Sequence, residues 1–313
     1  MKLVLFESES IGRRPGVLLT AGDKEFVLDL VSAFAAEGMP PPASLVEVLG
    51  ADAMLAVARI VEQARNDWGS AAVRKCLIPA ARARLMAPVP ERPFVICTGA
   101  NYGSHLLEMN ATSQPQRPFA FVKSPHAVIG PGMPIKLPEL LPNMVDFEGE
   151  LCVVFGRRCR NVAAADAMNY VAGYTILNDV SARDGLAGIR VPGTEPVVTV
   201  GIMLMGKHFP TFCPLGPVVA TPDEIPDWRR MHIVTTLNGT VMQDGYTDDL
   251  IFGIPALIEE FSHVYTFEPG DVMSTGSPPG VGMGRKPPVF MKPGDEVAIT
   301  VEGIGTLRNP ITA

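Results

Sequence analysis

Two glutamates, Glu148 and Glu150, stand directly before an apolar run, Leu151–Phe155, and this segment constrains the fold more than any other. The apolar run predicts a core strand, on which side chains two residues apart point to the same face. Two like charges that close together are costly unless a cation or a proton lies between them. The segment therefore indicates an acidic site at the mouth of a buried strand, although such a pair alone is more often solvated charge at a strand end.

A third carboxylate, Asp179, follows a second apolar stretch, Val171–Asn178. Together with Glu148 and Glu150 it would supply three oxygen ligands, which suit a hard divalent ion. Positions left open on the ion would accept a 2-oxo acid or an enolised 1,3-diketone, because each offers two adjacent oxygens. We therefore expect Mg²⁺ (or Mn²⁺) as cofactor and a small-molecule oxo-acid as substrate.

Composition excludes several classes of protein. The chain has 313 residues, nearly half of them hydrophobic, and a formal net charge of -7. Its basic residues are scattered, which argues against a nucleic-acid partner or an anionic membrane surface. No stretch approaches the ~20 apolar residues of a membrane-spanning helix, and the first apolar run is too short for a signal peptide. We expect a cytoplasmic protein that acts on a small molecule.

The cysteines agree with that location. Their number is odd, no Cys-x-x-Cys pair occurs, and several lie in apolar surroundings, which is typical of reduced and buried thiols. They are Cys76, Cys97, Cys152, Cys159 and Cys213.

Residues 1–85 are expected to form a small N-terminal α+β domain without a chemical motif, a packing or partner surface. The predicted strands are Lys2–Phe6, Arg14–Leu19 and Glu25–Leu30, with a hairpin turn at Gly22-Asp23, and the predicted helices are Val31–Glu37 and Ser44–Asn66. Residues 86–93 are Pro-rich and lack periodicity, which indicates a linker.

Residues 94–313 have a different sequence pattern, in which short β-rich runs alternate with Pro and Gly. The predicted strands are Phe94–Cys97, Phe119–Lys123, Leu151–Phe155, Val171–Asn178, His232–Leu237, Asp271–Thr275 and Glu296–Val301. Helices are few, chiefly Ala163–Met168 and Ile254–Tyr265. The pattern predicts a mixed α/β fold dominated by β-structure, in the form of a barrel or roll.

Several short motifs follow one another between residues 90 and 313. They are Asn101–Glu108, Phe121–Pro125, the Glu148/Glu150 strand, Gly173–Asp184, Gly206–Phe209, Gln243–Gly245, Thr275–Gly282, Pro293–Glu296 and Glu302–Pro310. As an ordered set they resemble the fumarylacetoacetate hydrolase family. The resemblance implies a catalytic domain at 94–313, folded as a β-sandwich roll with the metal site at its mouth, and a homodimer.

His105 and Glu108 are candidates for acid–base chemistry. Three residues apart on a helical turn, their side chains would meet, and a carboxylate beside an imidazole raises its basicity and fixes its tautomer. A lone histidine on a helix is usually structural, but the resemblance implies that this pair lies on a segment that orders over bound substrate. The polar segment Met109–Pro118 looks like part of such a lid.

Five further residues are candidates for the site. The resemblance implies that Lys207 lies near the metal, where its ammonium would stabilise an enolate; otherwise it is a solvated strand-end lysine. Arg183 suits carboxylate recognition, or it supports the site through a salt bridge to Asp184 or Asp179. Ser277 stands where family members usually carry a Thr that contacts substrate. Lys123 and Gln243 are expected next to the site, with roles that stay open.

The leading hypothesis is a Mg²⁺- or Mn²⁺-dependent hydrolase that cleaves a carbon–carbon bond of an acylpyruvate-like or fumarylacetoacetate-like β-diketo acid. In it, His105, backed by Glu108, activates a water, and Lys207 helps to hold the departing enolate. The same site would serve a 2-oxo acid decarboxylase or a hydroxy-dienoate isomerase of aromatic catabolism, because all of these reactions pass through an enolate. A non-catalytic ligand-binding relative is a further alternative, favoured only by Leu186, which stands where many members carry Gln.

Overall fold

A computed structural model describes residues 1–8, 11–185, 201, 203–225 and 227–313. Leu186, the departure from the family pattern, lies outside the described residues. So does most of the apolar stretch that follows it.

One large sheet runs through the described chain, in the order β4-β3-β2-β1-β14-β12-β11-β17-β6-β7, with β5 paired to β1 and β8 to β14. Its strands are β1 (Lys2–Ser8), β2 (Ile11–Ala21), β3 (Lys24–Asp29), β4 (Leu77–Pro79), β5 (Arg84–Met86), β6 (Val95–Gly99), β7 (Phe119–Lys123), β8 (Val128–Ile129), β11 (Gly149–Phe155), β12 (Val171–Asn178), β14 (Cys213–Ala220) and β17 (Val272–Ser274).

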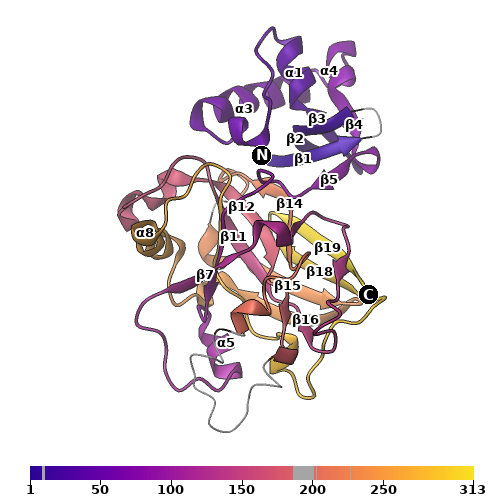
Figure 1. The fold of residues 1–313 in the computed structure, drawn as a ribbon. Coiled ribbons are helices and arrows are strands. Elements are labelled where there is room, and N and C mark those ends of the chain that lie inside the picture. The colour runs from indigo at the N-terminus through magenta and orange to yellow at the C-terminus, as the bar shows by residue number, and fades with distance from the viewer. Residues whose placement is uncertain (9–10, 186–200, 202, 226) are drawn as a thin grey trace.

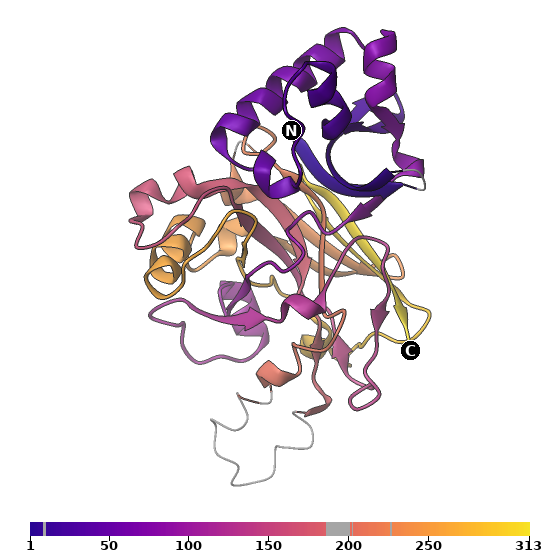
Figure 2. The same cartoon turned by 45° about the horizontal axis from the view of Figure 1, so that its top comes forward.

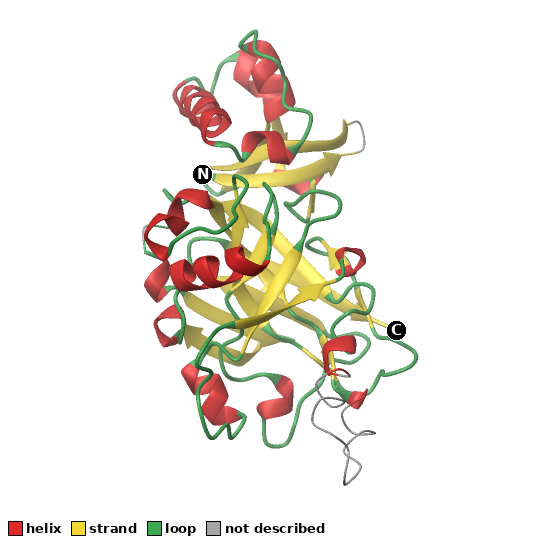
Figure 3. Cartoon of the chain, turned by 60° about the vertical axis from the view of Figure 1, so that its left-hand side comes forward, coloured by secondary structure: helices red, strands yellow, loops and turns green. Residues whose placement is uncertain are grey.

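A second sheet has the order β16-β15-β18-β19-β9, and β10 pairs separately with β13. These strands are β9 (Ile135–Lys136), β10 (Val145–Asp146), β13 (Ser181–Ala182), β15 (His232–Leu237), β16 (Thr240–Tyr246), β18 (Glu296–Val301) and β19 (Gly305–Thr312). Figure 3 shows the strands through the centre of the molecule, with helices on its outside.

The α-helices are α1 (Leu30–Ala36), α2 (Leu45–Val48), α3 (Ala51–Asn66), α4 (Ala71–Cys76), α5 (Gly103–Glu108) and α8 (Ile254–Val264). The 3-10 helices are η1 (Ala80–Arg82), η2 (Pro125–Ala127), η3 (Ala164–Tyr170), η4 (Trp228–Arg230), η5 (Thr247–Asp249) and η6 (Gly282–Gly284). Helices α8 and η3 lie side by side in both cartoon views (Figures 1 and 2). Within the described part of the chain, no helix has the length and apolar character needed to cross a membrane.

The N-terminal unit shares its sheet with the rest of the protein. Strand β1 pairs with β14 in an antiparallel ladder, with Lys2 opposite Ala220 and Leu3 opposite Val219. Figure 1 shows this unit at the top, with α1, α3 and α4 around the strands β1 to β4. The division at residues 86–93 stays a prediction, but the ladder is continuous from the first residues into the large sheet.

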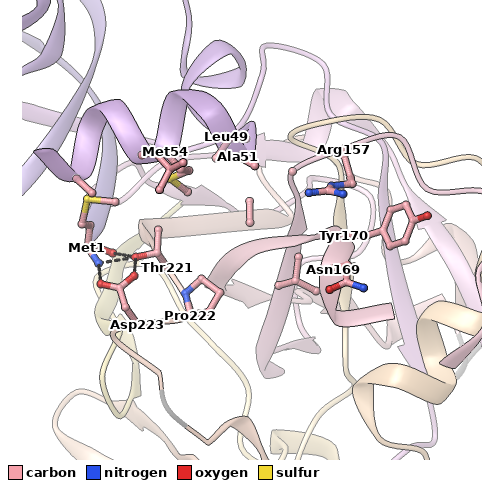
Figure 4. Close-up of a pocket in the computed structure, with 15 residues that line it drawn as sticks. Met1, Leu49, Ala51, Met54, Arg157, Asn169, Tyr170, Thr221, Pro222 and Asp223 are labelled. Carbon is pink, nitrogen blue, oxygen red and sulfur yellow. Dashed lines mark hydrogen bonds and ion pairs between the residues drawn. The ribbon is translucent and has the colours of Figure 1, made fainter. Parts of the chain in front are cut away.

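Close packing joins the N-terminal helices to the end of β11. A Cβ on Gly156 would lie 2.8 Å from the Leu49 carbonyl oxygen, so the two segments approach too closely for a side chain. Beside this contact lies a cavity of about 280 Å³, lined by Met54, Tyr170 and Asp223 among others (Figure 4). None of the site residues predicted from the sequence lines this cavity.

The two faces of β11 enter different cores. Leu151, Val153 and Phe155 pack with residues of the second sheet and of α8, whereas Cys152 and Val154 pack with a cluster that includes the N-terminal helices. The ring of Phe155 stacks on Phe267 with centroids 4.2 Å apart. A strand buried on both faces loses its alternation of polar and apolar residues, which explains the continuous apolar run in the sequence.

The fold class predicted from the sequence is confirmed, and four strands have the predicted bounds: β7, β12, β15 and β18. Some local predictions were wrong. The single helix expected at Ser44–Asn66 is two helices, because Gly50 interrupts it and serves as the N-cap of α3. The helix expected at Ala163–Met168 is a 3-10 helix. Helix α4 and strands β14, β16 and β19 were not predicted.

Leu151→Ala is expected to lower the free energy of unfolding by about 2–5 kcal/mol, because it opens a cavity in the core beside the carboxylates. Leu151 has no exposed surface, whereas Leu55 on α3 is 73% exposed. Leu55→Ala is the matched control and should change stability by less than ~1 kcal/mol. Urea unfolding of both variants measures the difference, and equal losses would contradict the assignment of Leu151 to the core.

Candidate active site

Three buried carboxylates meet at one point, as the sequence predicted. Oxygens of Glu148, Glu150 and Asp179 lie within 4.8 Å of one another. Strands β11 and β12 bring them together, because Gly149 lies opposite Asn178 in the antiparallel ladder. The Asp179 backbone N–H also donates to the Glu148 carbonyl oxygen (2.8 Å). The segment before β11 is thereby fixed to the segment after β12.

The start of β11 packs directly against the second sheet. A Cβ on Gly149 would lie 2.3 Å from Thr235 Oγ1, so only glycine allows the sheets to pack this closely. The Gly149 N–H donates to Gln243 Oε1 (2.9 Å), and the Gln243 amide donates to Ser277 Oγ and to the Pro278 carbonyl oxygen (both 2.8 Å). Gln243 and Ser277, both candidate substrate contacts, therefore connect the strand to the loop after β17.

Two buried lysines compensate part of the negative charge. Lys207 Nζ donates to Glu148 Oε2 (2.8 Å) and Asp179 Oδ2 (2.6 Å), and it lies 5.1 Å from the centroid of the Phe121 ring. Lys123 Nζ donates to Asp179 Oδ1 (2.6 Å). Lys207 is thus placed at the carboxylates, where the resemblance put it, and Lys123 fixes Asp179 from its other side.

Arg183 is buried and forms its ion pairs with Asp146 and Glu148. In the alternative in which Arg183 only supports the site, the expected partners were Asp184 or Asp179, and the structure shows Asp146 and Glu148 instead. Asp184 accepts backbone N–H groups of residues 143 and 144 (2.8 and 2.5 Å). The guanidinium therefore lies at the edge of the carboxylate cluster.

The three carboxylates differ in protonation because their surroundings differ. Burial alone would raise the pKa of Glu148, but the charges of Lys207 and Arg183 outweigh it and lower that pKa. Burial raises the pKa of Glu150 well above its ordinary value, and the negative charges of Asp179 and Glu148 raise it further. Without a further cation, protonation is thus favoured at Glu150 over Glu148.

His105 and Glu108 form the predicted pair on α5. His105 Nδ1 lies 3.0 Å from Glu108 Oε2, and Glu108 Oε1 accepts the Gly280 N–H (2.9 Å). Helix α5 is anchored at its start, where the Ser104 N–H donates to Asp249 Oδ2 (3.0 Å). With Nδ1 facing Glu108, the other ring nitrogen of His105 is the one left to exchange a proton with a substrate. Movement of Met109–Pro118 as a lid stays a prediction.

Sequence reasoning missed several residues that support the cluster. Ser274 Oγ donates to Glu150, Ser181 Oγ accepts from Lys207 (2.8 Å), and Asn178 Oδ1 accepts the Glu148 N–H (3.0 Å). Asp146 was also missed, although it precedes Glu148 by two residues. The alternation that pairs Glu148 with Glu150 would have included Asp146 as well.

The donor set fits a hard divalent cation. Three buried carboxylates supply oxygen ligands within 4.8 Å of one another, which is within reach of one ion. Glu148, Glu150 and Asp179 would hold the ion, while Lys207 and Arg183 would remain beside it. The identity of the metal is not fixed by these residues, because Mg²⁺ and Mn²⁺ accept the same ligands.

Mg²⁺ should stabilise the protein more strongly as the pH rises. A carboxyl whose pKa is raised on folding stabilises the fold at low pH, and that contribution is lost as the pH passes its folded pKa. For Glu150, the metal-free protein should lose stability above the ordinary Glu range, and Mg²⁺ should restore it. Thermal unfolding with and without Mg²⁺ over a pH series measures this effect. Glu150→Gln should abolish it and the exposed control Glu302→Gln should not; a Mg²⁺ effect that weakens with rising pH would contradict the assignment.

The chain is similar to known proteins over nearly its whole length. The mitochondrial oxaloacetate tautomerase FAHD2A of Bos taurus is 38% identical over 312 residues, which are 99% of this chain and 91% of that protein. The oxaloacetate tautomerase YisK of Bacillus subtilis is 37% identical over 300 residues, 92% of this chain and 94% of that protein.

Solved structures are also similar to this chain over its whole length. A 5-carboxymethyl-2-hydroxymuconate delta-isomerase from Mycobacterium smegmatis has a TM-score of 0.72 and 33% identity, covering 100% of this chain and 98% of that one. A maleylpyruvate hydrolase from Sphingobium sp. SYK-6 has a TM-score of 0.74 and 29% identity, covering 100% and 99%. The family described as fumarylacetoacetate (FAA) hydrolase C-terminal matches residues 94–312. The chain, with its carboxylate cluster and His–Glu pair, therefore belongs to the fumarylacetoacetate hydrolase family.

Proposed function

We propose that this protein is a metal-dependent keto–enol tautomerase that acts on an oxaloacetate-like 2-oxo dicarboxylic acid. One observation carries the proposal: a histidine whose Nδ1 is bound by a carboxylate lies beside a buried carboxylate cluster suited to a divalent cation. The loop after β17 joins the two groups, because its Gly280 N–H donates to Glu108 and its Gly282 N–H donates to Asp146, which pairs with Arg183 beside Glu148. The two oxaloacetate tautomerases support the choice of reaction.

Tautomerisation needs one proton to leave carbon and another to reach oxygen. His105 Nε2 takes the proton from the carbon next to the carbonyl, and Glu108 stabilises the imidazolium that results. The electron pair of the broken C–H bond forms the C=C bond, the carbonyl oxygen takes a proton from water to become the enol, and the His105 imidazolium returns its proton to water. A cation held by Glu148, Glu150 and Asp179 would supply positive charge where the oxygen becomes negative.

Lys207 and Arg183 contribute charge rather than protons. Burial alone would lower the pKa of Lys207, but Asp179 and Glu148 outweigh it, so the pKa is raised and the ammonium stays charged at neutral pH. Lys207 therefore stabilises negative charge on the enolate oxygen. The planar guanidinium of Arg183 suits the carboxylate of the substrate.

Carbon–carbon bond hydrolysis is the second candidate, and the His105–Glu108 pair favours it as well. The same imidazole would take a proton from water instead of carbon, and the water oxygen would attack a carbonyl. The maleylpyruvate hydrolase of similar structure supports this alternative. Hydrolysis breaks a carbon–carbon bond and tautomerisation does not, so their products separate them. Decarboxylation of a 2-oxo acid would release carbon dioxide.

The enol absorbance of oxaloacetate tests the proposal directly. We expect the protein to accelerate the approach to keto–enol equilibrium in Mg²⁺ or Mn²⁺, without loss of total oxaloacetate, and chelator to stop it. His105→Ala should lower the rate at least ~100-fold, because a positioned general base is removed. An acylpyruvate is assayed in parallel. Cleavage of the acylpyruvate without tautomerisation would establish the hydrolase instead, and loss of oxaloacetate would establish a decarboxylase.

Gly284→Ala is expected to reduce activity while leaving the metal site intact. A Cβ at this position would lie 2.4 Å from Glu108 Cδ, so the Glu108 carboxylate must shift from the position in which it contacts His105. We expect a loss of roughly tenfold or more in kcat, by analogy with the loss of partners that orient catalytic groups. Gly50→Ala is the control, because a Cβ there meets nothing within 4 Å. Steady-state kinetics and Mg²⁺ titration measure both effects. Unchanged kcat in Gly284→Ala would show that the Glu108 contact is dispensable.

A further inference from the structure

Asp146 is a buried carboxylate that contacts both Arg183 and the loop after β17. Its side chain has no exposed surface. Asp146 Oδ2 accepts from both Nε and Nη2 of Arg183 (3.2 Å each), and Arg183 Nη2 also donates to Glu148. Because Nε and Nη2 are both bound, the orientation of the whole planar guanidinium is fixed.

The same carboxylate holds the loop after β17. Asp146 Oδ1 accepts the Gly282 N–H (2.7 Å), and Oδ2 accepts the Met283 N–H (3.1 Å). The Gly280 N–H, two residues earlier, donates to Glu108 (2.9 Å). One short loop therefore touches the carboxylate that orients Arg183 and the carboxylate that orients His105.

We propose that Asp146 is a positioning residue that fixes Arg183 and the Gly280–Gly284 loop relative to each other. The part of this inference that concerns substrate rests on the proposed function, in which Arg183 binds the substrate carboxylate. Asp146 acts through Arg183 and does not itself contact the reacting atoms.

Asparagine cannot replace Asp146 in this role. The carboxylate accepts from N–H groups at both oxygens, whereas an amide would direct its own N–H₂ at one set of these donors. Asp271 offers a matched control. It is buried and accepts two backbone N–H groups, from Phe94 (2.9 Å) and Glu268 (2.7 Å), and Asp271→Asn thus tests the general cost of this change away from Arg183.

A double-mutant cycle tests the proposal with Asp146→Asn, Arg183→Lys and the double variant. The measured quantities are kcat/KM for oxaloacetate and the Kd of oxalate, a stable dianion, for the Mg²⁺-loaded protein. Each single substitution should weaken oxalate binding about tenfold or more. The double variant should lose less than twofold beyond Arg183→Lys, because Asp146 acts through the same guanidinium. Asp271→Asn should change the oxalate Kd only slightly, and by the same factor in the wild-type and Arg183→Lys backgrounds. Fully additive losses for Asp146→Asn would overturn the proposal.

A conservative variant separates positioning from general stability. Asp146→Glu keeps the carboxylate and should recover part of the oxalate affinity lost in Asp146→Asn, and equal losses in both would overturn the proposal. The oxalate measurement does not depend on turnover. A wild-type protein that binds oxalate but does not accelerate the keto–enol interconversion of oxaloacetate would therefore contradict the proposed function, while the cycle would still decide the role of Asp146.

Discussion

The charge balance of one buried cluster governs the rest of this structure. Four acidic side chains, Asp146, Glu148, Glu150 and Asp179, and three basic ones, Lys123, Arg183 and Lys207, are each less than a tenth exposed. Buried charges are tolerated only when they are paired and hydrogen-bonded, and here one negative charge is left over. Burial, together with the charges of Asp179 and Glu148, raises the pKa of Glu150 and favours its protonated form. A divalent cation beside an ionised Glu150 would instead make the cluster positive by one charge, which suits an anionic substrate.

The loop after β17 links the parts of the site that the strands cannot reach. Strand pairing alone explains how Glu148, Glu150 and Asp179 meet, since Glu150 lies in the β11–β12 ladder and the other two flank it. The His–Glu pair comes from α5, outside that ladder. The loop reaches this pair through the Gly280 N–H, which donates to Glu108. Glycine is required at Gly282 in this loop because a Cβ there would lie 1.9 Å from the Val289 carbonyl oxygen and 2.6 Å from Asp146 Oδ1.

Local sequence predicted much of the fold and of the site, and long-range pairing accounts for most of what it did not predict. Apolar runs with Pro and Gly boundaries located β7, β12, β15 and β18, and alternation placed Glu148 and Glu150 on one face, with Asp179 added from the end of a second apolar stretch. The neighbours of Arg183 could not be found in this way, because Asp146 lies 37 residues away along the chain. Gln243 was predicted near the site, but its bonds to Gly149 and Ser277 depend on how the two sheets stack. The reaction could not be chosen from sequence because hydrolysis, decarboxylation and isomerisation share one enolate.

The ladder between β1 and β14 makes the N-terminal unit part of the architecture of the site. Strand β14 lies between β1 and β12, and β12 leads directly to Asp179. A fragment restricted to the family-matched residues 94–312 would lack β1, so Val219 and Ala220 at the end of β14 would lose their partners in what is now the interior of a sheet. Exposed strand edges of this kind recruit other strands, so such a fragment is a candidate for aggregation or strand exchange rather than for an independent enzyme. The N-terminal unit thus protects this part of the β14 edge from pairing with other strands.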